Sequence, residues 1–229
     1  MKKNILIISA HPDDETLGCG GLIYQNSKKN NIKVIFLGEG TSCRFEEKDD
    51  EEIISREIEK RKNYCLKALK ILGVRNYEFY NLPCGQFDQI PIIKIGNIIE
   101  KEISNFKPHI IITHSKNDVH VDHKISYQAT IQSTRPGTKN QVEKILSFEI
   151  LSSSEKNFEE PFAPNYFLKI NENALRRKIK ALKCYKSEIS KHPFSRSELN
   201  IKSLALLRGA QSGNYYAEAF KIVRIIKKD

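Results

Sequence analysis

No apolar run in this sequence of 229 residues approaches the ~20 residues that a membrane-spanning helix needs. The first residues, Met1-Lys2-Lys3, and the short apolar stretch behind them are similar to the start of a signal peptide. That stretch runs into His11-Pro12-Asp13-Asp14 and not into a small-residue cleavage site, so a buried strand is the better interpretation. We therefore expect a cytoplasmic protein without a membrane span.

Cysteine is scarce, and its spacing argues against the usual cysteine-based frameworks. The five cysteines are widely separated, their number is odd, and no Cys-x-x-Cys pair is present. This spacing indicates neither a disulfide framework nor a thiolate zinc site. We expect reduced and mostly buried thiols at Cys19, Cys43, Cys65, Cys84 and Cys184.

A concentrated basic surface is also missing, although the formal net charge is +10. The basic residues are spread over segments 51–70, 176–186 and 221–228, and acidic residues are mixed into the first of them. No basic stripe with interleaved aromatic residues is present, so we expect no nucleic-acid partner. The hydrophobic content of 39% and the length suffice for one globular domain with a sizeable core.

Strand-like and helix-like segments alternate along the chain. Apolar runs rich in β-branched residues predict strands over 4–10, 33–37, 77–80, 109–113, 144–150 and 166–170. Helical periodicity predicts helices over 15–29, 51–72, 91–106 and 172–186. Gly73 suits the C-cap of the second helix, and Pro91 suits the first turn of the third. The alternation predicts one Rossmann-like α/β domain over residues 1–229, with a mostly parallel sheet and helices on both faces.

Polar residues with catalytic potential collect after two of the predicted strands. The first strand is followed by Ala10-His11-Pro12-Asp13-Asp14-Glu15, and the strand over 109–113 is followed by a segment that ends in His120-Val-Asp-His123. Ligand sites of open parallel sheets lie at the carboxyl ends of the strands, so the two segments are expected to meet. Five of the six histidines lie in or beside them.

This combination of residues predicts a catalytic metal site. One histidine and one aspartate from the first segment, with one histidine from the second, would leave a fourth zinc position open. The cation would offset the repulsion between clustered carboxylates. A carboxylate beside the metal could take a proton from a metal-bound water. Two histidines and an aspartate also suit other divalent ions such as Fe²⁺.

Simpler interpretations remain open for single residues. Asp13 or Asp14 could cap the helix that follows. His109 begins a buried run, which favours a core or strand-edge position, and His114 is compatible with either a structural or a functional role. Asp118 is a candidate to orient one of the histidines.

Two other kinds of function are compatible with the same residues. Gly18, Gly20 and Gly21 loosely follow a dinucleotide-binding pattern, so a non-catalytic nucleotide-binding module is one alternative. Their spacing is not Gly-x-Gly-x-x-Gly and three acids precede them, which favours close packing of a helix on the sheet. The second alternative keeps the metal but changes the reaction to that of a deformylase or a phosphoesterase.

The two segments resemble the LmbE-like (PIG-L) family of zinc-dependent N-deacetylases. The family's first motif, Ala-His-Pro-Asp-Asp-Glu, is matched in full by residues 10–15, and its second motif, His-x-Asp-His, is matched by residues 120–123. The weaker likeness includes Arg61, Ala68 and the Leu-Gly-Val of residues 72–74, and residues 216–220 resemble the family's closing segment. Tyr64 departs from the pattern, since many members have glutamate there.

The resemblance implies a metal centre with assigned ligands. His11, Asp14 and His123 would bind zinc, and Asp13 would be the general base acting on the zinc-bound water. A positively charged His120 would stabilise the oxyanion or protonate the leaving amine. Asp122 would orient His120 by a hydrogen bond.

The resemblance also implies a substrate class, because family members usually remove an acetyl group from an N-acetylglucosamine unit. We expect a small-molecule N-acyl amino sugar or its conjugate. Candidates for substrate binding are Arg44 with the rest of segment 38–44, Arg61, segment 83–88, and Arg135 with residues 136–137; ordinary surface arginines are an equal alternative. Segment 211–216 is a candidate to close over the site, and loop packing is an equal alternative for it. A homo-oligomer is compatible with the sequence.

Overall fold

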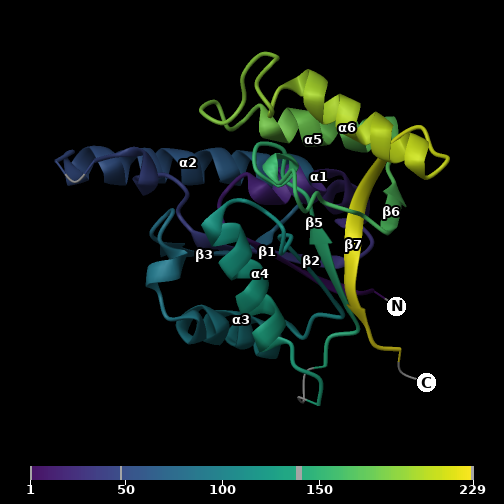
Figure 1. Ribbon diagram of the computed structural model, residues 1–229, viewed down its shortest axis with the longest axis horizontal. Coiled ribbons are helices and arrows are strands. Elements are labelled where there is room, and N and C mark those ends of the chain that lie inside the picture. Colours follow the sequence, from purple (N-terminus) through teal and green to yellow (C-terminus); the bar gives the residue numbers. More distant parts are fainter. Residues whose placement is uncertain (1, 47, 138–140, 228–229) are drawn as a thin grey trace.

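The apolar runs join into one seven-stranded sheet in the computed structural model, which describes residues 2–46, 48–137 and 141–227. The strand order is β3-β2-β1-β4-β5-β7-β6 (Figure 1). Neighbouring strands from β3 to β5 are parallel, whereas β7 runs antiparallel to β5 and β6. The strands are β1 (Asn4–Ser9), β2 (Asn31–Gly38), β3 (Asn76–Leu82), β4 (Ile110–Thr113), β5 (Lys144–Phe148), β6 (Tyr166–Lys169) and β7 (Ala217–Ile225). The predicted α/β fold with a mostly parallel sheet is confirmed.

Six helices lie in the described residues and cover both faces of the sheet (Figure 1). One face is covered by α1, α2, α5 and α6, whose apolar residues join a single core cluster. The other face is covered by α3 and α4, which pack on the second cluster. The helices are α1 (Asp14–Asn26), α2 (Glu51–Leu72), α3 (Ile92–Phe106), α4 (Val121–Ser133), α5 (Glu172–Leu182) and α6 (Glu198–Gln211).

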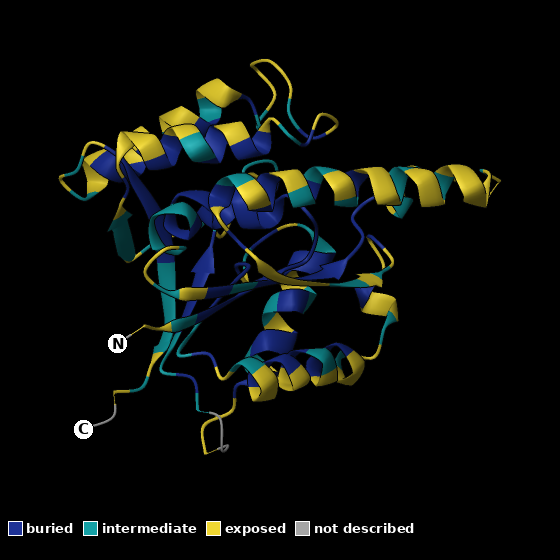
Figure 2. Ribbon diagram, turned by 180° about the vertical axis from the view of Figure 1, so that it is seen from behind, coloured by how far each residue is buried: buried dark blue, intermediate teal, exposed yellow. Residues whose placement is uncertain are grey.

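Alternation along the central strand β1 builds these two cores. Ile5 and Ile7 belong to the cluster under α1, α2 and α5, while Leu6 and Ile8 belong to the cluster under α3 and α4. All four side chains are buried because the strand has helices on both faces. Figure 2 shows the result: the centre of the sheet is buried, while the outer sides of the helices are exposed.

The predicted elements agree with the structure except in the later part of the chain. Helix α2 has the predicted bounds, and Gly73 caps it with φ +82°. Pro91 precedes α3 as its N-cap residue. Three elements lacked a prediction, namely α4, α6 and β7. Helix α4 buries Ser126, Thr130 and Ser133 and therefore shows no apolar periodicity.

The glycines after the first motif serve packing. A Cβ atom at Gly18 would lie 2.5 Å from the ring of Phe148, so only glycine lets α1 approach β5 this closely. The carboxylate of Glu218 accepts hydrogen bonds from the backbone N–H groups of Gly21 and Leu22. These contacts confirm the packing interpretation of the glycines. None of the helices in the described residues is long and apolar enough to span a membrane.

Candidate active site

The two polar segments meet where β1 and β4 end. These strands are parallel neighbours, with Ile7 paired to Ile112. The first segment continues from β1 into α1, and the second continues from β4 into α4. Residues about 100 positions apart in the chain therefore share one edge of the sheet, as expected for a ligand site of this fold.

His11, Asp14 and His123 come together as a buried group. Their ligand atoms all lie within 4.8 Å of one another. Asp14 Oδ2 lies 3.7 Å from His11 Nδ1 and 3.4 Å from His123 Nε2. Ligand atoms bound tetrahedrally to zinc at about 2.1 Å are about 3.4 Å apart. The spacing and the donor set therefore fit a divalent cation between these three side chains.

The electrostatics of this group also favour a cation. Burial raises the pKa of Asp14, but His123, His114 and His11 outweigh it and hold that pKa well below its usual range. Burial disfavours the charged form of His123, yet Asp14 and Asp118 raise its pKa to about 10. Positive charge is thus stabilised at the point where the three ligand atoms converge.

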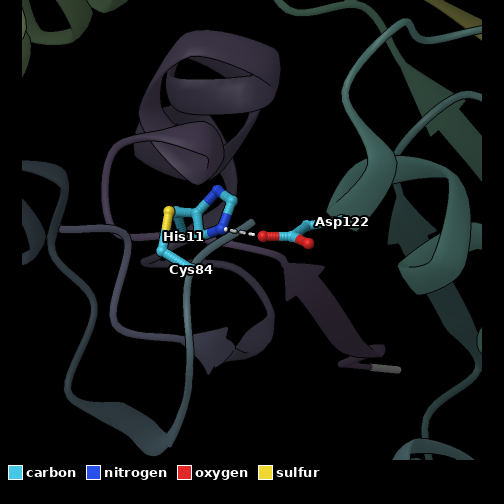
Figure 3. Close-up of side chains that lie close together, drawn as sticks. All are labelled: His11, Cys84 and Asp122. Atoms are coloured by element: carbon cyan, nitrogen blue, oxygen red, sulfur yellow. Dashed lines mark hydrogen bonds and ion pairs between the residues drawn. The ribbon is translucent and has the colours of Figure 1, made fainter. Parts of the chain in front are cut away.

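Two carboxylates contact the ring nitrogens of His123 and His11 that face away from Asp14. Asp118 Oδ1 lies 3.2 Å from His123 Nδ1, which leaves Nε2 of this ring facing Asp14. Asp122 Oδ2 lies 2.8 Å from His11 Nε2, which leaves Nδ1 facing Asp14 (Figure 3). A histidine ligand whose second nitrogen donates to a carboxylate is held in one tautomer and one orientation. The expected contact between Asp118 and one of the histidines is present.

The hydrogen bond predicted between Asp122 and His120 is made by the Asp122 backbone N–H, whereas the Asp122 carboxylate contacts His11. This carboxylate accepts from His11 and from the backbone N–H groups of Gly85 and Phe87, at 2.6 and 3.1 Å. His120 is held instead by the backbone, since its Nδ1 accepts a hydrogen bond of 3.2 Å from the Asp122 N–H. His120 is the N-cap residue of α4, so its orientation is fixed by the start of the helix.

The surroundings of His120 do not favour the positive charge that the resemblance implies. Burial is the main cause that lowers the pKa of His120 to about 4, and His123 and His11 lower it further. The ring is therefore neutral at pH 7. Because Nδ1 accepts from the backbone, the proton lies on Nε2, and His120 is a hydrogen-bond donor.

A second group of potential ligands shares His11. Ligand atoms of His11, Cys84 and Asp122 also lie within 4.8 Å of one another, and Figure 3 shows Cys84 beside the other two side chains. The Asp122 carboxylate already accepts three hydrogen bonds, which makes it the weaker candidate. The group around Asp14 is therefore the stronger candidate for a metal, and Cys84 lies next to it. No motif or spacing pointed to Cys84 as a potential ligand; it follows β3 in a short turn.

Asp13 combines strain, burial and a free oxygen. As the N-cap residue of α1 it has φ +118°, a left-handed conformation that favours glycine. Its Oδ2 lies 2.6 Å from Arg196 Nη1 and 3.2 Å from Arg61 Nη2. Its Oδ1 is buried and has no hydrogen-bond partner within the described residues. Burial raises the pKa of Asp13 to about 7, against the opposing pull of Arg196 and Arg61, which suits a general base.

Arg61 and Arg196, which pair with Asp13, belong to a network of ion pairs around Glu188. Arg61 is buried and donates to the backbone oxygens of Pro12 and Gly40. Glu188 accepts from Arg44 at 2.8 Å and from Arg196 at 2.9 Å, and lies 3.1 Å from Arg61. Sequence reasoning missed Arg196 and Glu188, since neither belongs to a motif or a periodic pattern.

The three arginines predicted to bind substrate lie in different places. Arg61 is enclosed by protein groups and positions Asp13. Arg44 is exposed, in the 3₁₀ turn η1 (Ser42–Arg44). Arg135 is exposed beyond the C-terminal end of α4. That helix of 13 residues is about 20 Å long, and its other end carries the site, so Arg135 is not brought to it.

The remaining polar residues of the motifs have structural roles. Glu15 is buried and accepts hydrogen bonds from the Asp13 N–H and the Tyr185 hydroxyl, at 3.0 and 2.9 Å. His114 Nε2 accepts a hydrogen bond of 2.8 Å from the Ala10 N–H, and burial lowers its pKa well below the usual value. His109 Nδ1 accepts from the Asn4 N–H, which confirms a strand-edge position.

The sequence of this chain is similar to a protein family and to known deacetylases. The family model "GlcNAc-PI de-N-acetylase" (PIG-L) matches residues 6–134. The chain is 24% identical to the diacetylchitobiose deacetylase of Thermococcus kodakarensis, over 96% of this chain and 83% of that protein. It is 30% identical to the uncharacterized deacetylase YaiS of Escherichia coli, over 81% of this chain and 92% of that protein.

A solved structure shows that the fold alone does not determine the reaction. The 4-carboxy-2-hydroxymuconate hydratase GalB of Pseudomonas putida matches with a TM-score of 0.77 and 20% identity, over 100% of this chain and 99% of that one. The reaction of this chain must therefore be inferred from its site residues and its family, and not from the fold.

Proposed function

Because the chain belongs to the PIG-L family of GlcNAc-PI de-N-acetylases, we propose that it is a metal-dependent hydrolase that removes the N-acetyl group from an amino sugar or its conjugate. The family match and the deacetylase relatives support amide hydrolysis. The observation that carries the proposal is the buried triad of His11, Asp14 and His123, with the unpartnered Oδ1 of Asp13 next to it in sequence.

The triad is the proposed metal site. A divalent cation held by His11, Asp14 and His123 would polarise the amide carbonyl and make water more acidic. Zinc fits the donor set, and Fe²⁺ fits it as well. The chain's own contribution is to keep the two rings in the correct tautomers through Asp118 and Asp122.

Asp13 is the proposed general base. Its Oδ2 is held by Arg196 and Arg61, so the carboxylate cannot rotate freely. Its Oδ1 is the atom that would take a proton from the attacking water. A buried carboxyl with a pKa of about 7 can take that proton near neutral pH and release it again.

His120 is the proposed partner of Asp13 across the reacting amide. Its Nδ1 accepts from the Asp122 N–H, so its Nε2–H is the donor. That N–H would stabilise the oxyanion of the tetrahedral state by a hydrogen bond. A neutral ring keeps this proton, so His120 is not proposed as the acid that protonates the leaving amine. A neutral donor at this position stabilises developing negative charge without competing with the metal for the site.

Two contacts argue against the nucleotide-binding alternative. The ring of Phe148 packs against Gly18, and the Glu218 carboxylate accepts a hydrogen bond from the Gly21 N–H. Neither glycine is therefore free to face a nucleotide pyrophosphate.

The exposed Arg44 remains a candidate for hydrogen bonds to a sugar hydroxyl or a phosphate at the rim of the site. A small N-acylated amino sugar or its conjugate is the proposed substrate.

A substrate panel tests the proposal. Purified protein is stripped with a chelator, reloaded with Zn²⁺ or with Fe²⁺ under anaerobic conditions, and incubated with N-acetylglucosamine and diacetylchitobiose. Released acetate and free amine are both measured, with N-formyl sugars and a phosphoester as comparison substrates. We expect acetate release that depends on the added metal. Turnover of only the formyl compound or the phosphoester would replace the deacetylase with one of the alternatives.

A further inference from the structure

Two cysteines from separate loops lie side by side next to the candidate active site. Cys43 is in the turn η1 after β2, and Cys84 follows β3. Their Sγ atoms are 2.7 Å apart. The backbones are close as well, since a Cβ atom at Gly85 would lie 3.2 Å from the Cβ atom of Cys43. The pair combines the exposed Cys43 with the buried Cys84, while the expectation of mostly buried cysteines holds for Cys19, Cys65 and Cys84.

One carboxylate fixes both loops in this arrangement. Glu39 accepts from the backbone N–H groups of Thr41 and Ser42 at 2.6 and 3.0 Å. It also accepts from the Cys84 N–H at 2.7 Å. The meeting of the two thiols therefore depends on backbone contacts in both loops, and not on a rotamer of one exposed side chain.

We propose that Cys43 and Cys84 are a peroxide-oxidised thiol pair that closes reversibly to a disulfide. The Cys43 sulfur attacks one oxygen of hydrogen peroxide, the O–O bond breaks, and the released hydroxide leaves as water with the Cys43 proton. Cys43 is then a sulfenic acid. The Cys84 sulfur attacks the Cys43 sulfur, and the S–OH bond breaks. The hydroxyl leaves as water with the Cys84 proton. Two thiols and one peroxide thus give one disulfide and two waters.

The environment favours Cys43 as the sulfur that reacts first. It is exposed, whereas Cys84 is buried behind it. The hydrogen bond with the Cys84 thiol lowers the pKa of Cys43 to about 7, which increases its thiolate fraction. The other cysteines differ on both counts. Cys19 and Cys65 are buried with raised pKa values, and burial raises the pKa of Cys184, which has no thiol partner within the described residues.

The location of the pair indicates what a reversible disulfide would protect, whichever reaction the site catalyses. The Cys84 sulfur lies within 4.8 Å of the potential ligand atoms of His11 and Asp122. The residue after it, Gly85, holds the Asp122 carboxylate through its N–H. Irreversible oxidation at this point would place a charged sulfinate among these groups. A disulfide can be reduced again, so pairing with Cys43 protects the position.

Peptide mapping of the full chain tests the proposal without any activity assay. Protein reduced and freed of reductant receives one equivalent of hydrogen peroxide in the presence of dimedone, which traps sulfenic acids. Remaining thiols are blocked, and the protein is cut with trypsin. We expect peptide 34–44 joined to peptide 76–94, little dimedone on Cys43, and loss of two thiols per chain that a reductant restores. Cys184→Ser should behave in the same way.

The Cys84→Ser variant separates the two steps. Without the resolving thiol, Cys43 should be labelled by dimedone and no joined peptide should form. The Cys84→Ala variant repeats the test if the serine variant folds poorly. Equal dimedone labelling of Cys43 in the unsubstituted protein would overturn the proposal. Peroxide-dependent sulfinic acid without the joined peptide would overturn it too.

Discussion

The Nε2 atom of His11 lies 2.8 Å from the Oδ2 atom of Asp122, and this contact joins the two halves of the candidate metal centre. His11 follows β1, whereas Asp122 lies in the first turn of α4. The Asp122 carboxylate also accepts from the backbone N–H groups of Gly85 and Phe87. The loop after β3 therefore takes part in orienting a proposed metal ligand.

Replacing Asp122 by asparagine should weaken metal binding. The variant loses the charge that orients His11, and an amide NH₂ would face backbone N–H donors. We expect the metal affinity to fall by about 10- to 100-fold, measured by competition with a chromophoric chelator. Asp88→Asn is the matched control, since this exposed carboxylate lies nearby in sequence and bonds to Gln89. Unchanged affinity in Asp122→Asn would show that the contact does not orient His11 for metal binding.

Replacing Asp13 by asparagine should separate catalysis from metal binding. The amide cannot take a proton from water, while the three proposed ligands stay in place. We expect turnover to fall by about 100- to 10,000-fold, with metal content unchanged by elemental analysis. His123→Ala is the comparison variant and should lose the metal. Metal loss in Asp13→Asn would make Asp13 a ligand and remove its role as base.

The central sheet and the core of the site were predictable because the signals are local. A run such as residues 109–113 is apolar on both faces of a strand, and the two motifs lie directly after strands. The order of parallel strands then brings His11, Asp14 and His123 together. Helix α4 was missed because it buries serine and threonine side chains, which hides its apolar periodicity. The antiparallel β7 was missed as well, in a segment noted for its basic residues and for its likeness to the family's closing segment, but not as a strand.

The supporting residues were not predictable, since their contacts join distant parts of the chain. Arg196 lies 183 positions from Asp13, yet its guanidinium donates to the Asp13 carboxylate. Cys84 lies 41 positions from Cys43. Neither residue stands in a motif or at a helical spacing from its partner. The contact of the Asp122 carboxylate with His11 was not predicted for a related reason: motif spacing does not show which nitrogen faces which carboxylate.

Replacing Gly18 by alanine should destabilise the protein. The new methyl group would lie 2.5 Å from the Phe148 ring, so α1 or the ring must move. We expect a loss of about 1–3 kcal/mol in the free energy of unfolding, measured by urea denaturation. Gly20→Ala is the matched control, because its methyl group meets the flexible stem of Lys178 at 3.1 Å. Equal stability of the two variants would show that the approach of α1 to Phe148 does not require glycine.

Replacing Arg196 by glutamine should shift the pH dependence of turnover. Asp13 acts as a base only when it is deprotonated, so activity should be lost as the pH falls through the Asp13 pKa of about 7. Arg196 stabilises the charged carboxylate at 2.6 Å, and its removal raises that pKa. The acid limb of the kcat/KM profile should therefore move to higher pH, by about one unit. Arg176→Gln, at an exposed arginine paired with Glu172, should leave the profile unchanged. An acid limb that stays in place in Arg196→Gln would mean that a group other than Asp13 controls it.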